Sequence, residues 1–183
     1  EVEAFLLRIK FPMTIGYGMT ETAPLISFTP WDRFRAQSCG QVLAGFMEAR
    51  IANPDQDGVG EIQVRGENLM AGYYKNEQAT ADSFTEDGWL RTGDLGTIDK
   101  DGFIYIKGRC KTMLLGPSGQ NIYPEEIEAK INNMPYVLES LVLQKDTKLV
   151  ALVCPDFEAV DADKLTQDQL EVIMEDNRKL VNQ

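Results

Sequence analysis

The stretch MEARIANPDQDGVGEIQVR, residues 47–65, decides the class of fold. At both of its ends, apolar side chains alternate with polar ones, which is the pattern of a β-strand with one solvated face. Between them lies Asn53-Pro54-Asp55-Gln56-Asp57-Gly58, which is dense in residues that form turns. This stretch therefore predicts an antiparallel pair of strands joined by a turn.

A second pair of strands is predicted further along the chain. Gly96-Thr97-Ile98 leads into the turn Asp99-Lys100-Asp101-Gly102, and Phe103-Ile104-Tyr105-Ile106 leads out of it. Nearer the N-terminus, residues 1–11 predict a helix followed by a short strand. The glycine-rich residues 15–22 predict a loop between buried elements. The first part of the chain is therefore expected to be rich in β-structure.

The pattern becomes mixed in the last third of the chain. Pro124 suits the first position of a helix, and the apolar runs at 136–143 and 149–153 predict a hairpin. Thr166 and Gln169 have the spacing of a capping box at the start of the last helix. The apolar stripe of that helix is expected to comprise Leu170, Ile173, Met174 and Leu180.

Composition excludes several classes of function. The formal net charge is −11 over 183 residues, and no basic stripe is present, which argues against nucleic-acid binding. Histidine is absent, so catalytic triads and zinc sites that need it are excluded within these residues. The three cysteines are far apart and form no C-x-x-C pair, which fits reduced thiols in a cytoplasmic protein. No apolar run approaches the roughly 20 residues that span a bilayer.

The hexapeptide Gly16-Tyr17-Gly18-Met19-Thr20-Glu21 is the first candidate for chemistry. Its glycines permit a ligand to approach the backbone closely. Tyr17 can stack on a base, Thr20 can donate to a phosphate and Glu21 can hold Mg²⁺. A tight turn around a buried tyrosine explains the same residues equally well, so the hexapeptide alone leaves both interpretations open.

Three later positions are also candidates, each with a plain structural alternative. Asp94, within Thr92-Gly93-Asp94, can accept hydrogen bonds from both hydroxyls of a ribose, or it can close a turn. Arg109 offers a planar fork for sugar or phosphate oxygens, or it belongs to a polar linker. Gly119 permits close approach of a ligand, or it serves only the entry to the helix at Pro124.

These segments, taken in order, resemble the motifs of the adenylate-forming enzymes, a family of acyl-CoA synthetases, peptide-synthetase adenylation domains and luciferase-like enzymes. Tyr17-Gly18-Met19-Thr20-Glu21 matches the family's Y-G-x-T-E motif. The later matches are Gly60-Glu61-Ile62, Gly66, Gly72-Tyr73-Tyr74-Lys75-Asn76, Thr92-Gly93-Asp94, Gly108-Arg109 and residues 119–128. The amino-acid sequence of residues 115–124 is most similar to that of bacterial long-chain fatty-acid-CoA ligases. The chain is thus identified as resembling the C-terminal part of such a ligase.

The resemblance implies an α+β fold in two units. Residues 1–110 are expected to be the end of the large AMP-binding domain with its barrel-like β-subdomain, and residues 111–183 most of a small, mobile α/β domain. It also implies a two-step ligase, which couples a carboxylic acid to the α-phosphate of ATP and then transfers the acyl group to coenzyme A. ATP, Mg²⁺ and coenzyme A are the implied reactants and cofactors.

The resemblance also carries roles over residue by residue. Thr20 and Glu21 are implied to be catalytic residues: Thr20 would bind phosphate, and Glu21 would bind Mg²⁺. The nucleotide site is implied to comprise Tyr17, Gly18, Thr20, Asp94 and Arg109, with Tyr17 stacked on adenine and the last two holding the ribose. Lys111 falls at the family's hinge position, where the small domain swings between half-reactions. Gly119 is implied to line the path of the pantetheine arm of coenzyme A.

Two features of the family have no counterpart in these residues. The phosphate loop belongs well before the Y-G-x-T-E motif, and the adenylation lysine belongs in a glycine-lysine segment near the C-terminus; Lys179 is interpreted as a solvated helix lysine. We therefore expect the 183 residues alone to be catalytically inactive. We also expect them to self-associate, through apolar surface around Ile15 and the first helix.

Other functions stay open at this stage. Within the family, the substrate could be an amino or aryl acid, because the residues that choose the acid lie mostly elsewhere. A peripheral membrane contact of the parent protein is also open. From a different class, the chain could be a non-catalytic protein-interaction module with acidic hairpins. Such a module would ignore ATP and AMP, whereas a nucleotide site would respond to the substitution Asp94→Ala.

Overall fold

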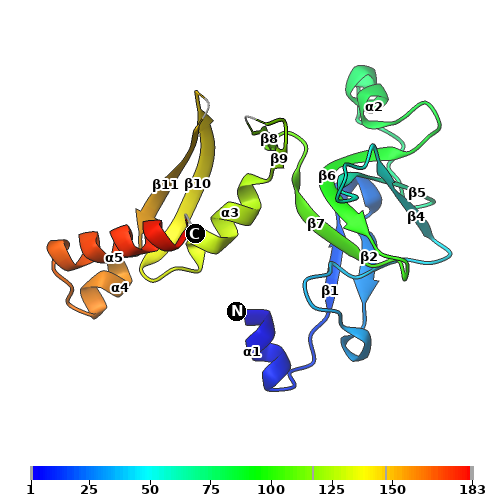
Figure 1. Ribbon diagram of the computed structural model, residues 1–183. Helices are drawn as coiled ribbons and strands as arrows, with labels where there is room; N and C mark the ends of the chain where they lie inside the picture. Colours follow the sequence, from blue (N-terminus) through cyan, green and yellow to red (C-terminus); the bar gives the residue numbers. More distant parts are fainter. Residues whose placement is uncertain (1, 117, 147, 182–183) are drawn as a thin grey trace. The chain divides into compact units, whose positions relative to one another are not determined.

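The computed structural model describes residues 2–116, 118–146 and 148–181. The chain divides into two compact units, Glu1–Lys111 and Thr112–Gln183 (Figure 1). The structure places the division after Lys111, one residue later than the division after residue 110 that the sequence predicts. Both units mix helices with antiparallel strands, so the predicted α+β class is confirmed.

The larger sheet of the first unit is a four-stranded antiparallel meander. Its strands, in order across the sheet, are β4 (Met47–Ala52), β5 (Gly60–Gly66), β6 (Leu90–Ile98) and β7 (Ile104–Arg109). Ala49 pairs with Val64 and Ile51 with Ile62, as the alternation of apolar side chains predicted. β6 pairs with β7 across the second predicted turn. Both predicted hairpins are therefore confirmed.

A second, three-stranded sheet contains the segment that the sequence predicted as a loop. β1 (Ile15–Gly18) pairs with β2 (Leu25–Thr29), and β2 with β3 (Gln41–Val42); the 3₁₀ turn η1 (Thr20–Thr22) connects the first two. The loop prediction was wrong for the first half of residues 15–22. The glycines there serve close packing of strands, because a Cβ on Gly18 would lie only 1.7 Å from the carbonyl oxygen of Pro24.

The helical segments of the first unit are short. α1 (Val2–Arg8) was predicted, but the strand expected directly after it is not formed by residues 9–11. η2 (Trp31–Arg33) and α2 (Glu77–Ser83) were not predicted, because two turns or fewer give no readable apolar period. α2 is capped by Asn76, whose side-chain oxygen accepts a hydrogen bond from the Ala79 amide at 3.1 Å.

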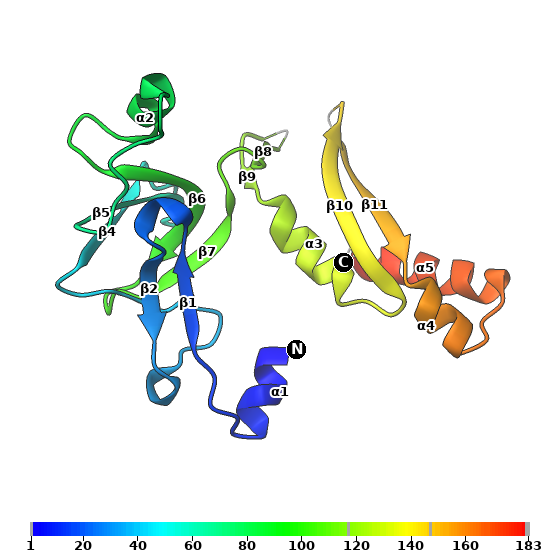
Figure 2. The same cartoon turned by 180° about the vertical axis from the view of Figure 1, so that it is seen from behind.

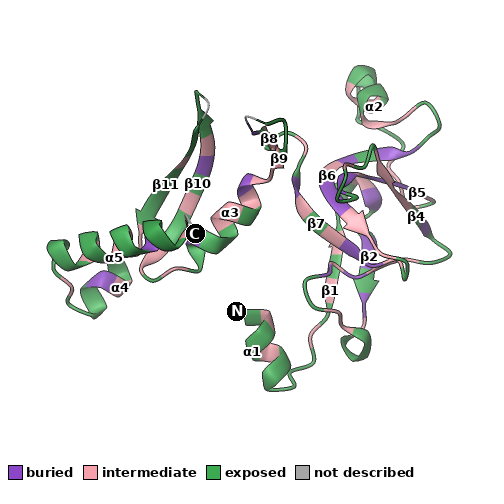
Figure 3. Cartoon of the chain, viewed as in Figure 1, coloured by how far each residue is buried: buried purple, intermediate pink, exposed green. Residues whose placement is uncertain are grey.

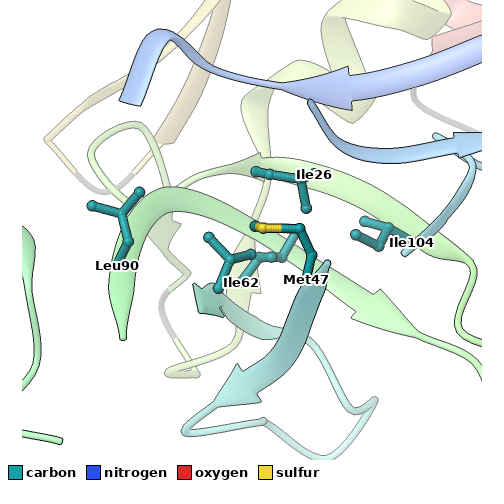
Figure 4. Packing of buried hydrophobic residues seen from close by; sticks show 6 residues of the cluster. Ile26, Met47, Ile62, Leu90 and Ile104 are labelled. Atoms are coloured by element: carbon teal, nitrogen blue, oxygen red, sulfur yellow. The ribbon is translucent and has the colours of Figure 1, made fainter. Parts of the chain in front are cut away.

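The core of the first unit joins its two sheets. Ile26 of β2 packs with Met47, Ile62, Leu90 and Ile104 of the meander (Figure 4), and Val64 belongs to the same cluster. None of these residues is more than 5% exposed. The same strands carry most of the buried segments of this unit in Figure 3. This apolar contact holds the β1–β2 hairpin against β6, which brings distant parts of the sequence together.

The described residues of the second unit form two hairpins and three helices, which Figure 2 shows from behind. Its elements are β8 (Leu114–Leu115), β9 (Asn121–Ile122), α3 (Pro124–Asn132), β10 (Val137–Lys145), β11 (Lys148–Pro155), α4 (Phe157–Ala162) and α5 (Gln167–Val181). Pro124 opens α3, and β10 pairs antiparallel with β11, so both predictions are confirmed. Thr147, in the predicted turn, lies outside the described residues.

α5 begins as predicted, but its buried stripe differs. The Thr166 amide donates to Gln169 Oε1 at 2.9 Å, and the Gln169 amide donates to Thr166 Oγ1 at 3.3 Å, which is a capping box. Leu180 is 59% exposed, and the buried position belongs to Asn177, which donates to the Pro135 carbonyl at 2.9 Å. The prediction for Leu180 was wrong because, at 3.6 residues per turn, it lies at the edge of the stripe.

Among the helices described, none combines the length and the apolar character that crossing a bilayer requires.

Candidate functional site

Three of the predicted nucleotide-binding residues meet in the first unit. The Tyr17 hydroxyl, on β1, donates to Asp94 Oδ2 at 2.6 Å. On the other side, Arg109 Nε lies 3.0 Å from Asp94 Oδ1. Asp94 and Arg109 are direct partners in the register of β6 and β7. Each oxygen of the Asp94 carboxylate thus has a fixed neighbour, and the two contacts orient the group.

The backbone around Asp94 is held by its own hydrogen bonds. Gly93 has a φ of 72°, a conformation that favours glycine, and its carbonyl accepts from the Cys110 amide at 2.8 Å. Thr92 is buried and donates to the Ile62 carbonyl at 2.7 Å, while its oxygen accepts from the Asp94 amide at 3.1 Å. The threonine and glycine of this motif therefore fix where the Asp94 side chain emerges from β6.

The cluster joins a largely buried carboxylate to an exposed guanidinium. Burial raises the pKa of Tyr17 well above its ordinary range, and the hydrogen bond to Asp94 raises it further, so Tyr17 is a stable donor. The side chain of Asp94 is 15% exposed, whereas that of Arg109 is 63% exposed. A carboxylate accepts from hydroxyls, and a guanidinium donates in a planar fork. This pairing suits a ligand that carries neighbouring hydroxyl groups.

Thr20 and Glu21 lie on η1, directly after β1. Glu21 Oε1 accepts a hydrogen bond from the Tyr73 hydroxyl at 2.7 Å, and the Glu21 carbonyl accepts from the Met70 amide at 2.8 Å. Thr20 is exposed. The turn that carries both predicted catalytic residues is therefore part of the same hairpin as Tyr17, with Glu21 fixed and Thr20 facing solvent.

Glu21 fits a cation that arrives with its ligand. In the described part of the chain, no group of three or more His, Cys, Asp or Glu side chains could hold a metal ion. Mg²⁺ is commonly bound through one or two carboxylates together with substrate phosphates. A single oriented carboxylate such as Glu21 therefore suits Mg²⁺ bound to a nucleotide.

The remaining predicted positions have different surroundings. Gly18 is fixed by its contact with the Pro24 backbone. Lys111 is exposed at the end of the first unit. Gly119 lies in the β8–β9 loop of the second unit, with a φ of 82° and its amide donating to the Gly116 carbonyl at 2.9 Å. The turn explains why glycine stands there, and the roles of Lys111 and Gly119 stay predictions.

Sequence reasoning missed the two residues that hold the Glu21 turn. Tyr73 contacts Glu21 from 52 residues away, and Asn68 donates to the Leu25 carbonyl at 3.0 Å from 43 residues away. Tyr73 belongs to the family motif at residues 72–76, which is the one feature of the sequence that could have drawn attention to it. Asn68 and the Tyr73–Glu21 contact had no local signature, because both contacts depend on the path of the chain after β5.

Residues 1–74 match the sequence model of the AMP-binding enzymes. These residues belong to this family. Long-chain-fatty-acid–CoA ligase ACSBG2 of Gallus gallus is 36% identical over 154 residues, which are 84% of this chain and 20% of that protein. Long-chain-fatty-acid–CoA ligase ACSBG1 of Homo sapiens is 31% identical over 177 residues, 96% of this chain and 24% of that protein. These relatives are from animals, so the similarity to bacterial ligases stays a prediction.

Solved structures of AMP-binding enzymes share the fold. Unliganded o-succinylbenzoate–CoA synthetase MenE of Bacillus subtilis matches with a TM-score of 0.71 and 30% identity, over 90% of this chain and 38% of that chain. ATP-bound MatB of Rhodopseudomonas palustris matches with a TM-score of 0.68 and 32% identity, over 86% of this chain and 35% of that chain. The chain spans about a fifth of the length of the first curated relatives it matches.

Proposed function

We propose that the first unit forms the ribose side of the nucleotide site of an ATP-dependent acid–thiol ligase. The contact of Tyr17, Asp94 and Arg109 carries this proposal, because it joins an aromatic ring, an oriented carboxylate and an exposed guanidinium, and Tyr17 and Asp94 lie 77 residues apart in the sequence. Membership of the AMP-binding family supports it. Asp94 and Arg109 bind the ribose hydroxyls, and the ring of Tyr17 stacks on the adenine.

The proposed reaction has two steps. A carboxylate oxygen of the acid attacks the α-phosphorus of ATP, and the bond to the leaving pyrophosphate breaks, which gives an acyl-adenylate. The thiol of coenzyme A then attacks the acyl carbon, and AMP leaves. MatB has been solved with ATP, and MenE with ATP and magnesium and with the acyl-adenylate OSB-AMP. These ligands support the same reactants for this chain.

The other roles follow from position in the family pattern. Thr20 contacts the phosphate, and Gly18 lies in the nucleotide site. Glu21 binds Mg²⁺, and a bound Mg²⁺ neutralises the negative charge that develops on the phosphate. Lys111 acts as the hinge between the large domain, to which residues 1–110 belong, and the mobile small domain. Gly119 lines the path of the pantetheine arm. The exposure of Thr20 and Lys111 and the oriented Glu21 carboxylate are compatible with these roles.

A long-chain fatty acid is the proposed acyl substrate. The support is the name of the curated relatives, which are long-chain-fatty-acid–CoA ligases at 31–36% identity. The fold does not choose the acid, because MenE, an o-succinylbenzoate–CoA synthetase, matches at 30% identity. Activation of an aryl or amino acid is therefore the alternative within the family.

Three further points belong to the proposal. The 183 residues alone are inactive, because they span about a fifth of their curated relatives. The exposed apolar side chains of the first helix, such as Phe5 at 51%, favour self-association and leave a peripheral membrane contact open. The three cysteines are free thiols, which fits a cytoplasmic protein.

AMP binding to this chain tests the nucleotide site. Replacing Asp94 with alanine removes the acceptor for the ribose and the partner of Tyr17 and Arg109, so the affinity for AMP is expected to fall at least about tenfold. Isothermal titration calorimetry measures it. The matched control is Asp87→Ala, which removes an exposed aspartate paired with Arg50 at 2.6 Å and should leave the affinity unchanged. Equal AMP affinity in the Asp94→Ala variant and the unchanged chain contradicts the proposal.

A further inference from the structure

The segment between β5 and α2 holds the backbone of the Glu21 turn. The Met70 amide donates to the Glu21 carbonyl at 2.8 Å. Asn68 Nδ2 donates to the Leu25 carbonyl at 3.0 Å and also to the carbonyl of Thr22. The turn is thus fixed at Glu21 and just after it by one segment that follows β5, and not only by its own hairpin.

Tyr73 extends this support to the Glu21 side chain. Its hydroxyl donates to Glu21 Oε1 at 2.7 Å. Its own backbone is anchored to α2, because its amide donates to Thr80 Oγ1 at 2.9 Å and that hydroxyl donates to the Asn76 carbonyl at 2.9 Å. Gly72 has a φ of 145°, and a Cβ there would lie 2.8 Å from Thr80 Cγ2. The glycine therefore allows Tyr73 to reach both α2 and Glu21.

The donor to Glu21 is a neutral phenol. In the described part of the chain, no lysine or arginine pairs with Glu21. An arginine in the same place would also orient the carboxylate, but it would offset the negative charge that a cation needs. A tyrosine fixes the direction of one oxygen and leaves the carboxylate its full charge.

We propose that Tyr73 is a positioning residue, which orients Glu21 for a divalent cation carried by a nucleoside triphosphate. This inference rests on the proposed function of the Tyr17–Asp94–Arg109 site, and it assigns a role to a residue outside that site. Tyr73 acts through Glu21 and contacts neither the sugar nor the base.

The test compares two ligands on this chain: AMP in the absence of metal, and ATP with Mg²⁺. Tyr73→Phe removes only the hydroxyl, so the affinity for Mg·ATP is expected to fall roughly two- to tenfold, the range for loss of one hydrogen bond, while the affinity for AMP stays unchanged. Glu21→Gln should show the same selective loss, and adding Tyr73→Phe to it should change nothing further. Tyr74→Phe, which removes the hydroxyl of a neighbour that is 88% exposed, is the matched control and should leave both affinities unchanged.

The outcomes separate this inference from the proposed function. A Tyr73→Phe variant that binds both ligands as the unchanged chain does, or that loses both equally, overturns the positioning role; the second result marks a merely structural residue. In either case Asp94→Ala still weakens AMP binding if the nucleotide site is real. Failure of the unchanged chain to bind AMP or Mg·ATP overturns the proposed function and the positioning role together.

Discussion

The Tyr17 phenol has a consequence for stability at alkaline pH. Burial and the hydrogen bond to Asp94 raise its pKa above the ordinary value of 10.0. The folded chain therefore keeps this proton at pH values where the unfolded chain has released it. The contribution of Tyr17 to the free energy of unfolding is thus full below about pH 10 and decreases as the pH rises further.

Tyr17→Phe removes this ionisation. From about pH 9 to about pH 11, the urea midpoint of the unchanged chain should fall more steeply than that of the variant. Below this range the variant should be less stable by about 1 kcal/mol, because it lacks one hydrogen bond. Tyr74→Phe, at an exposed position, should keep the slope of the unchanged chain. Equal slopes for the Tyr17→Phe variant and the unchanged chain would show that Tyr17 is not held as described.

At the same scale, the sequence predicted the residue types of the site better than their contacts. Tyr17, Asp94 and Arg109 were assigned to one ligand through a family pattern, and the structure brings them together. The contact of Tyr73 with Glu21 could not be predicted. Hydrogen bonds between distant loops depend on three-dimensional paths that no local period or spacing records.

At the scale of elements, the β1–β2 hairpin depends on how closely its strands approach. A Cβ on Gly18 would lie 1.7 Å from the Pro24 carbonyl oxygen, and one on Gly16 would lie 3.1 Å from the Ser27 carbonyl oxygen. The first is a severe clash with backbone, while the second requires a shift of a few tenths of an ångström. The two glycines are therefore not equivalent, although both stand in one short strand.

Gly18→Ala is expected to lower the free energy of unfolding by more than about 2 kcal/mol, because the strands must separate. Gly16→Ala is the matched control in the same strand, with an expected loss below about 1 kcal/mol. Urea unfolding followed by tryptophan fluorescence measures both. A Gly18→Ala variant as stable as the Gly16→Ala variant would be incompatible with the close strand contact.

Local patterns explain which elements could be predicted. The hairpin of residues 47–65 and the start of α3 at Pro124 follow from alternation, turn residues and proline, and they are present. Residues 15–18 were misjudged because Gly16 and Gly18 also suit a loop, and only the neighbouring strand explains them. Leu180 was misjudged because an apolar side chain at the edge of a stripe can stay exposed.

At the scale of the whole molecule, the division after Lys111 predicts separate unfolding of the two units. Both tryptophans, Trp31 and Trp89, lie in the first unit. Trp89 is 8% exposed and has Arg50 and Arg65 over its ring at 4.5 and 4.7 Å, so its emission should report the unfolding of this unit. Circular dichroism reports both units.

Urea titrations followed by the two signals should therefore give different midpoints, because the second unit contributes only to circular dichroism. Adding AMP should raise the fluorescence midpoint through binding to the first unit. Coincident transitions in the absence of ligand would show instead that the chain unfolds as one cooperative body.

The central claim is that Asp94 belongs to the nucleotide site of an acid–thiol ligase. Its most direct test is release of AMP from ATP by a protein of the length of the curated relatives that contains this chain. We predict release that requires coenzyme A and is fastest with long-chain fatty acids. We also predict that Asp94→Ala abolishes it and Asp87→Ala does not. No release with fatty, aryl or amino acids, or full release in the Asp94→Ala variant, would contradict the claim.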